Sequence, residues 1–200
     1  KKILVPNGVD ISRFRPLKMD ACRNKFGFPK DTLLVGYFGG MERDRGVDDL
    51  IKSVQKLRCH GVEIELLLGG TARADMNFPM SGVRFLGNIP YKSMPEIIAS
   101  CDLLAVPYRR SAFMDAGASN KIAEAMACGR PIVATKTPNL LTNFPHQAKQ
   151  LENLLAKPND PDDLARVLRL QIKRRVVVDM PPGFGWNHIA SRIKDQLLQE

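Results

Sequence analysis

The residues best suited to chemistry in this chain lie in two glycine-containing stretches, and the first covers residues 36–46. Its candidate ligand-binding residues are Gly39, Gly40, Arg43 and Arg45. Glycine allows a ligand to approach the backbone closely, and the amide groups at the start of a following helix favour phosphate. Arginine adds charge-assisted donors that match phosphate oxygens. This spacing predicts a diphosphate site, and a plain glycine turn with solvated arginines is the structural alternative.

The second stretch, residues 108–121, leads into a helical pattern that contains Glu124. Four of its small or polar residues lie where a helix N-terminus binds an anion: Gly117, Ser119, Asn120 and Lys121. Ser119 or Asn120 is expected to cap that helix. Glu124 is suited to accept hydrogen bonds from the hydroxyl groups of a ribose, and a surface salt bridge with Lys121 is the alternative.

Three aspartates, Asp160, Asp162 and Asp163, have the DxD spacing that can hold a divalent cation against a diphosphate. The same residues form a helix-start pattern, because Asp160 is a good cap and Pro161 suits the first helical position. We therefore predict a capping role, and we expect no bound metal and no cofactor.

The cysteines and histidines predict no reaction centre. The four cysteines are scattered along the chain: Cys22, Cys59, Cys101 and Cys128. None forms a CxxC pair, which argues against a local zinc site or a thioredoxin-like motif. Their scatter predicts buried thiols in a reducing compartment. The histidines stand apart from any nucleophile and receive no catalytic role: His60, His146 and His188.

The composition is that of a globular chain with a basic surface. The 200 residues are 44% hydrophobic, and 30 Lys and Arg against 21 Asp and Glu leave a net charge of +9. This charge suits nucleic acid, a lipid surface or a phosphorylated small molecule. Aromatic residues make up only 6% and are not interleaved with the basic ones, which argues against single-stranded nucleic acid. We expect no nucleic-acid partner.

No apolar run approaches the roughly 18 residues of a membrane span, and the opening Lys1-Lys2-Ile3 lacks the pattern of a signal peptide. We therefore expect a cytoplasmic protein, and peripheral contact with the inner face of a membrane is an open option. The chain has no initiator Met, and we expect it to be a piece of a longer polypeptide.

Short apolar runs alternate with helical patterns. The runs expected to form strands are residues 32–38, 62–68, 83–86, 102–106, 131–135 and 153–156. Most are continuously apolar, which is typical of strands covered on both faces. The patterns expected to form helices lie within residues 47–57, 94–101, 122–126, 164–172 and 189–197. The alternation predicts an α/β fold, a Rossmann-like parallel sheet with helices on both faces, and ligands at the carboxyl ends of the strands.

Two segments are expected to lack regular structure. Residues 136–150 are largely polar and contain Pro138 and Pro145, which predicts a mobile loop. Residues 174–184 contain the run Pro181-Pro182-Gly183, which predicts a connector.

Several segments together resemble the second domain of group 1 retaining nucleotide-sugar glycosyltransferases of the GT-B fold. The most specific is EAMACGRPIVA at residues 124–134, which resembles the block "EAMA.G.PVVA" of that family. Weaker segments occur in the order of the family: PNGVD followed by Phe14 and Pro16, the glycine stretch ending in Arg45-Gly46, VRFLG at 83–87, PNDP at 158–161 and WNHIA at 186–190. The resemblance spans nearly the whole chain.

The resemblance implies a hexosyltransferase that moves a sugar from a nucleoside diphosphate to an acceptor hydroxyl with retention. It implies that Arg45 neutralises the leaving diphosphate and that Glu124 holds the ribose hydroxyls. The residues implied to contact the base through their backbone are Gly87, Asn88 and Ile89.

The resemblance also implies a division of labour between domains. Residues 1–185 would form the Rossmann-like donor-binding domain, and residues 186–200 a helix that returns toward an N-terminal domain lying outside this chain. The acceptor site would lie on that other domain, so the present chain alone is expected to bind donor without turnover.

One position departs from the family pattern. The family often has two glutamates with seven residues between them, and Glu124 matches the second. Ala116 stands at the position of the first, and the neighbouring Asp115 is the candidate to replace it in contacting the donor sugar.

Two other functions are compatible with the sequence. A GT-B-type nucleotide-sugar 2-epimerase has the same architecture and is an isomerase. A non-catalytic nucleotide- or polyanion-binding module predicts affinity for polyanions that falls steeply with salt.

Overall fold

The computed structural model describes residues 7–78 and 81–198, so the first residue of the PNGVD segment and the last two residues of the chain lie outside it. Six strands form one sheet in the order β3-β2-β1-β4-β5-β6, and every neighbouring pair is parallel. Their bounds are β1 Leu33–Phe38, β2 Ile64–Gly69, β3 Val83–Phe85, β4 Leu103–Val106, β5 Ile132–Thr135 and β6 Leu155–Ala156. Each strand overlaps one of the six predicted runs, and the α/β prediction is confirmed.

The strand order creates a switch point between β1 and β4, because the chain adds strands to one side of β1 and then to the other side of it. Open parallel sheets bind their ligands in the crevice outside the carboxyl ends of the strands at such a point. Every residue of β4 and β5 is buried, as are all but the first residue of β1. Burial on both faces explains why these runs are continuously apolar.

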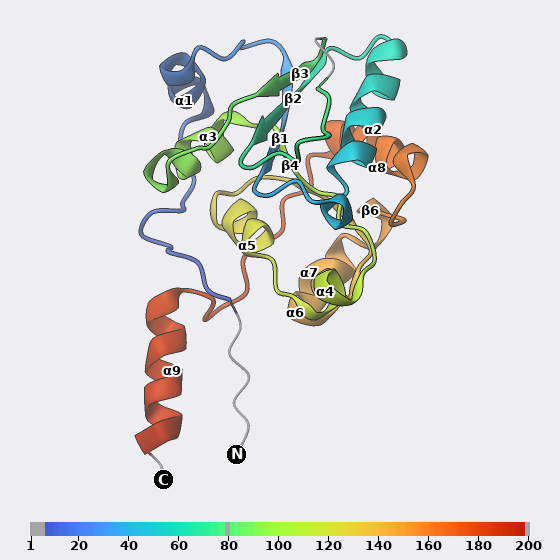
Figure 1. The fold of residues 1–200 in the computed structure, drawn as a ribbon. Helices are drawn as coiled ribbons and strands as arrows, with labels where there is room; N and C mark the ends of the chain where they lie inside the picture. Colours follow the sequence, from blue (N-terminus) through green and yellow to red (C-terminus); the bar gives the residue numbers. More distant parts are fainter. Residues whose placement is uncertain (1–6, 79–80, 199–200) are drawn as a thin grey trace.

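Helices cover both faces of the sheet (Figure 1). On one side α1 (Met19–Phe26) packs against α3 (Met94–Ser100), and on the other α2 (Val47–Cys59) packs against α8 (Pro161–Arg174). A fifth helix, α5 (Asn120–Ala127), contacts β4 and β5. The helical patterns predicted for α2, α3, α5 and α8 are therefore confirmed, whereas α1 was not predicted.

The prediction of a mobile loop over residues 136–150 is wrong. The segment forms α6 (Pro138–Asn143) and α7 (Pro145–Gln150), and each helix begins at its proline. Proline suits the first helical position because that residue needs no N–H partner and its φ angle is already helical. Three apolar side chains of the segment join the core: Leu140, Phe144 and Ala148.

The predicted cap of α8 and the predicted connector that follows this helix are both confirmed. Asp160 caps α8, since its Oδ1 accepts hydrogen bonds from the N–H groups of Asp162 (3.1 Å) and Asp163 (2.9 Å). The two following carboxylates pair with Lys56 and Arg166. The connector is also confirmed, because residues 175–184 contain neither helix nor strand.

At the amino end of β4, the buried side chain of Asp102 joins distant parts of the chain. Its carboxylate accepts hydrogen bonds from Arg23 (2.6 Å), Arg175 (2.8 Å) and the N–H of Leu34 (2.7 Å). Burial by itself raises the pKa of Asp102, but the Leu34 N–H and the two guanidinium groups outweigh it and hold the pKa below its usual value. This cluster connects α1, β1, β4 and the end of α8.

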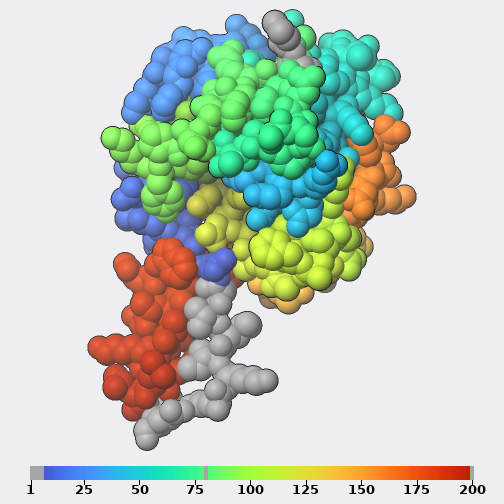
Figure 2. All heavy atoms as spheres, viewed as in Figure 1, coloured from blue at the N-terminus to red at the C-terminus, as the bar shows by residue number. Residues whose placement is uncertain are grey.

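The last helix, α9 (Trp186–Leu198), projects away from the sheet (Figures 1 and 2). Its predicted apolar stripe is present: Ile189 is buried, Ile193 is half-buried and Leu197 is 58% exposed. The far half of the stripe is therefore open to solvent in the described part of the chain. None of the helices between residues 7 and 198 is long and apolar enough to cross a membrane.

Candidate functional site

The two stretches predicted to bind a ligand meet at the carboxyl ends of β1 and β4. The N–H of Arg109 donates to the carbonyl of Asp44 (2.8 Å), and the Ser111 hydroxyl donates to the Asp44 carboxylate (3.1 Å). Gly46 has a φ of 69°, and a Cβ at this position would lie 1.8 Å from the carbonyl oxygen of Pro107. Only glycine fits where the two loops touch, so the switch point brings the predicted stretches together.

Figure 2 shows α5 at the floor of a hollow, with the glycine stretch and the second stretch among the segments at its border. Lys121, on the first turn of α5, extends over Gly39. A Cβ on Gly39 would lie 2.6 Å from the Lys121 Nζ, and the φ of Gly39 is 143°. The ammonium group lies over the ring of Tyr37 (5.6 Å) and donates to the Tyr108 hydroxyl (3.3 Å). These contacts fix a positive charge above the glycine backbone.

Arg45 supplies a second positive charge beside the same tyrosine. It ends the 3-10 turn η1 (Arg43–Arg45), and its guanidinium carbon lies 5.5 Å from the ring centre of Tyr108 and 5.7 Å from that of Phe113. Its Nε pairs with Glu42 at 3.3 Å, and 23% of the side chain is exposed. A guanidinium held in this way can exchange the Glu42 carboxylate for a phosphate oxygen.

Glu124 lies one turn beyond Lys121 on α5 and is half-buried. Burial raises the pKa of its carboxyl, and the charge of Lys121 opposes that rise. Both side chains border a small niche together with Phe38, Ile98, Leu104 and Ala105. Among the residues that the structure describes, Glu124 forms no ion pair with Lys121, so the salt-bridge alternative is not supported. The carboxylate is positioned to accept hydrogen bonds from a ligand.

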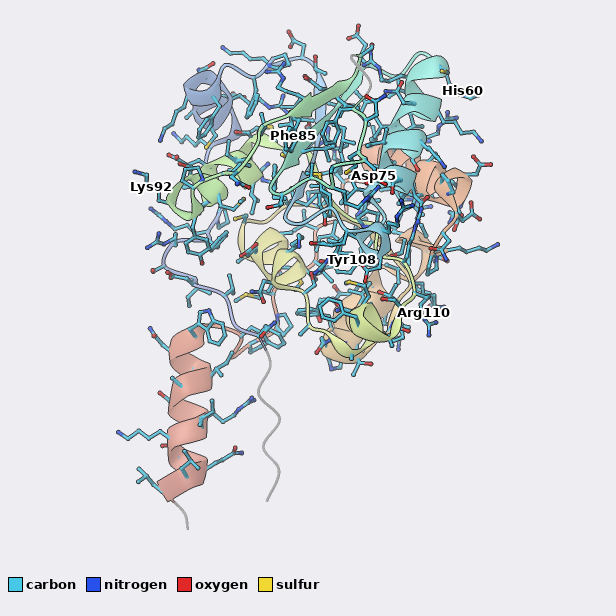
Figure 3. All side chains as sticks on the ribbon, viewed as in Figure 1. His60, Asp75, Phe85, Lys92, Tyr108 and Arg110 are labelled. Carbon is cyan, nitrogen blue, oxygen red and sulfur yellow. The ribbon has the colours of Figure 1, made fainter. Side chains whose placement is uncertain are left out.

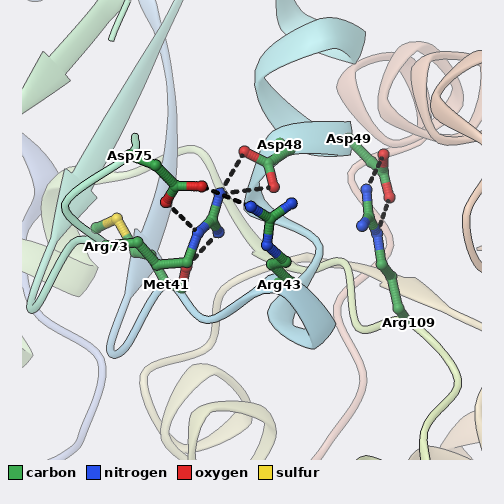
Figure 4. A network of polar contacts seen from close by, with 7 residues as sticks. All are labelled: Met41, Arg43, Asp48, Asp49, Arg73, Asp75 and Arg109. Carbon is green, nitrogen blue, oxygen red and sulfur yellow. Dashed lines mark hydrogen bonds and ion pairs between the residues drawn. The ribbon is translucent and has the colours of Figure 1, made fainter. Parts of the chain in front are cut away.

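Arg43 belongs to a separate network (Figure 4). Its Nη2 pairs with Asp75 at 2.6 Å, and the side chain is 76% exposed. Arg73 bonds to the same Asp75, to Asp48 on α2 and to the carbonyl of Met41. The network ties the loop after β2 to the glycine stretch, and it holds the Arg43 guanidinium on the loop side rather than on the Tyr108 side.

Asp115 and Gly117 hold the second stretch in shape. Asp115 lies in α4 (Ala112–Ala116), a short helix that was not predicted, and pairs with Arg110 at 2.7 Å. The carbonyl of Gly117 accepts a hydrogen bond from Asn139 on α6 (2.6 Å). The candidate replacement for the missing family glutamate is thus ion-paired within its own loop.

The expectation that Ser119 or Asn120 caps α5 is wrong. Ser119 occupies the N-cap position, but its hydroxyl bonds to that of Tyr108 (3.1 Å) and makes no capping hydrogen bond. Asn120 is the first, exposed residue of the helix. The first turn of α5 therefore has no side-chain cap, which leaves its amides available to an anion.

The residues predicted to contact a base follow β3, two strands away from β1. The carbonyl of Gly87 accepts a hydrogen bond from Gly70 (2.7 Å), and Asn88 is exposed. Ile89 packs on Gly69, where a Cβ would lie 2.3 Å from its Cδ1. The three residues lie on the side of the sheet formed by the carboxyl ends of its strands, separate from the loops that follow β1 and β4.

Three aromatic residues of the site were not singled out from the sequence. Tyr37 donates a hydrogen bond from its hydroxyl to the carbonyl of Gly40 (2.5 Å), and Phe113 is 71% exposed. Figure 3 shows Tyr108 beside α5, whereas His60 lies at the far end of α2. The available signal is position, because Tyr37 is the penultimate residue of β1 and Tyr108 lies just after β4, and these two strands flank the switch point.

Comparison with known proteins identifies the family. The family model described as "Glycosyl transferases group 1" matches residues 32–173, which is more than half of the chain. The chain belongs to the glycosyl transferases group 1 family. The matched span of this group 1 domain includes the glycine stretch, Arg45, Lys121 and Glu124.

Relatives of this group 1 domain include a GDP-mannose-dependent monoacylated alpha-(1-6)-phosphatidylinositol monomannoside mannosyltransferase of Corynebacterium glutamicum, 28% identical over 82% of this chain and 45% of the relative. A D-inositol 3-phosphate glycosyltransferase of Stackebrandtia nassauensis is 26% identical over 95% of this chain and 47% of the relative. The chain spans about half the length of the curated relatives it matches.

Solved structures share the fold of this group 1 domain. Sucrose-phosphate synthase from Thermosynechococcus elongatus matches 98% of the chain with 52% of its own length, at a TM-score of 0.78 and 20% identity. The C-terminal domain of a group 1 glycosyl transferase from Francisella tularensis matches 93% of the chain with 98% of its own length, at a TM-score of 0.64 and 16% identity. Anabaena HepE was solved in complex with UDP and glucose. It matches 99% of this chain with 57% of its own length, at a TM-score of 0.72 and 20% identity.

Proposed function

We propose that this domain binds a nucleoside diphosphate sugar and takes part in the transfer of a hexosyl group to an acceptor hydroxyl with retention. One observation supports this most strongly. Arg45 and Lys121 meet at Tyr108 beside the Gly39 backbone, at the switch point of the sheet, with Glu124 one turn away. Two cations beside a glycine loop suit a diphosphate, and a half-buried carboxylate suits ribose hydroxyls.

In this proposal the chain acts on the leaving group. When the bond between the anomeric carbon and the diphosphate oxygen breaks, its electron pair stays on the diphosphate, whose negative charge increases. Arg45 and Lys121 are already held in place, so they stabilise this charge with little reorganisation. The acceptor site and any acid–base group are proposed to lie on the other domain, and this chain alone is proposed to bind donor without turnover.

The relatives support a nucleotide-sugar donor and differ in the base. The Corynebacterium glutamicum relative is named as GDP-mannose-dependent, whereas the Anabaena structure contains UDP and glucose. We therefore propose a nucleoside diphosphate sugar as the donor class, and the first experiment compares uridine and guanosine nucleotides.

Isothermal titration calorimetry on the 200-residue chain tests the proposal with UDP, GDP, UDP-glucose, GDP-mannose and pyrophosphate. We expect one nucleotide to bind with 1:1 stoichiometry and more tightly than pyrophosphate, because the ribose adds hydrogen bonds. Affinity that follows ligand charge alone and falls steeply between about 50 and 200 mM salt would instead identify a polyanion-binding module.

Glu124→Gln is expected to weaken binding of the preferred nucleotide by about tenfold and to leave pyrophosphate affinity unchanged. The amide keeps the shape of the side chain but accepts hydrogen bonds more weakly than the carboxylate does. Calorimetry with both ligands measures the difference. An equal loss for nucleotide and pyrophosphate would show that Glu124 acts on the phosphate end of the site.

We also propose that α9 packs against the N-terminal domain of a longer protein. Its distal apolar side chains are exposed here, and the curated relatives are about twice as long as the matched region. An apolar stripe without a cover suits a partner surface.

Hydrogen exchange tests the state of α9 in the isolated chain. We expect the amides of residues 190–198 to exchange faster than those of α5, because α9 has only one buried residue whereas α5 has four. Mass spectrometry at several labelling times compares the two helices in one monomeric sample. Equal protection in α5 and α9 would show that α9 needs no second domain.

A further inference from the structure

We propose that Tyr108 is a positioning residue that holds both cations of the donor site; this inference rests on the proposed function. Tyr108 is 2% exposed, so it cannot serve as a ligand contact of its own. Its ring lies against the Arg45 guanidinium (5.5 Å) and the Lys121 ammonium (5.8 Å). One buried side chain therefore contacts both of the positive charges that the site presents.

The aromatic ring explains how two like charges stay near each other. The faces of an aromatic ring are electron-rich and attract cations, most strongly where water is excluded. The Arg45 side chain lies against the ring and also has a hydrogen-bonding interaction with the Tyr108 hydroxyl. Lys121 donates to the same hydroxyl oxygen (3.3 Å). The hydroxyl therefore serves both cations, whereas the ring face is what holds the Arg45 guanidinium.

The hydroxyl has a second hydrogen-bond partner. Besides accepting from Lys121, it shares a hydrogen bond with the Ser119 hydroxyl (3.1 Å) at the start of α5, in which either oxygen can donate. From the other side, the Thr135 hydroxyl donates to the Tyr108 carbonyl (2.6 Å) and ties the residue to β5. These hydrogen bonds fix the ring relative to α5 and the sheet.

Without the ring, Arg45 has another partner. Its Nε already contacts the exposed Glu42 carboxylate at 3.3 Å. Removal of the ring on the opposite side would let the guanidinium settle on Glu42, and a diphosphate would have to break that pair before it could bind. Tyr108 is thus inferred to keep Arg45 available to the ligand.

Two substitutions separate the ring from the hydroxyl. Tyr108→Phe keeps the ring for Arg45 and removes the hydroxyl that both cations use, and we expect roughly threefold weaker nucleotide binding. Tyr108→Leu removes both, and we expect roughly 10- to 30-fold weaker binding. The loss from Tyr108→Leu should shrink in an Arg45→Ala background, and the loss from Tyr108→Phe should shrink in a Lys121→Ala background, because coupled residues are not additive.

A matched control is Phe144→Leu, which removes another fully buried ring at a different place, where it packs on Phe184. It should lower thermal stability and leave nucleotide affinity unchanged. If Tyr108→Leu binds like the wild type, or loses as much affinity in both alanine backgrounds as alone, Tyr108 is a packing residue and the inference is wrong.

A ligand-free measurement separates this inference from the proposed function. The Nε–H resonance of Arg45 in the free chain should have a ring-current shift that Tyr108→Phe keeps and Tyr108→Leu removes. An unchanged resonance in Tyr108→Leu overturns the positioning role. If the resonance moves as expected while wild-type chain binds no nucleoside diphosphate, the proposed function fails and the positioning of Arg45 stands.

Discussion

Arg45→Ala is expected to lower the affinity for the preferred nucleoside diphosphate by about 10- to 100-fold, because a hydrogen bond to a charged group contributes about 1.5–3 kcal/mol. The Arg45 side chain is only 23% exposed, and its guanidinium lies against the rings of Tyr108 and Phe113. Alanine removes the charge and leaves the neighbouring backbone in place. Pyrophosphate affinity should fall by a similar factor, since Arg45 is assigned to the phosphates.

Arg43→Ala is the matched control. It removes the same kind of side chain from the same 3-10 turn, but the Arg43 side chain is 76% exposed and pairs with Asp75. We expect less than about a twofold change in nucleotide affinity, since exposed ion pairs contribute little. Calorimetry on both variants measures the contrast. Equal losses for the two variants would mean that the site attracts anions through net charge and has no specific guanidinium.

Most of the fold could be predicted because strands buried on both faces are continuously apolar, and such runs are visible in the sequence. The failure at α6 and α7 has a local cause. Leu140, Phe144 and Ala148 recur every four residues, which is a helical period. Pro138 and Pro145 look like interruptions of that period in the sequence, but each of them begins a helix. Proline has opposite meanings at the start and in the middle of a helix, and the position cannot be assigned before the helix is known.

The site could be predicted only in part, for a different reason. Glycine and arginine in one stretch indicate an anion site, but spacing cannot tell which arginine faces it. The structure separates the two because the 3-10 turn directs Arg45 toward Tyr108 and leaves Arg43 with Asp75. The role of Tyr108 depends on contacts with residues distant in the sequence, which only the packing of β1, β4 and α5 creates.

The cluster around Asp102 should have the largest effect on stability. Arg23 is 3% exposed and relies on the Asp102 carboxylate for its charge partner, while Arg175 approaches from the other side. Asp102→Asn keeps the volume and leaves a buried guanidinium without a counter-charge. Breaking a buried pair in this way costs about 3–5 kcal/mol of the free energy of unfolding. Glu96→Gln, which breaks the exposed pair with Lys25 (2.7 Å), should cost less than about 1 kcal/mol.

Urea denaturation of Asp102→Asn at several pH values separates charge from packing. Because the folded-state pKa of Asp102 is lowered, its contribution to stability is complete above the unfolded-state pKa of about 3.9 and is lost as pH falls through the folded-state value. The gap in unfolding free energy between wild type and Asp102→Asn should therefore be widest at neutral pH and narrow below about pH 4. A gap of the same size at pH 7 and pH 3 would mean that the loss comes from packing, and that Asp102 does not stabilise the fold through its charge.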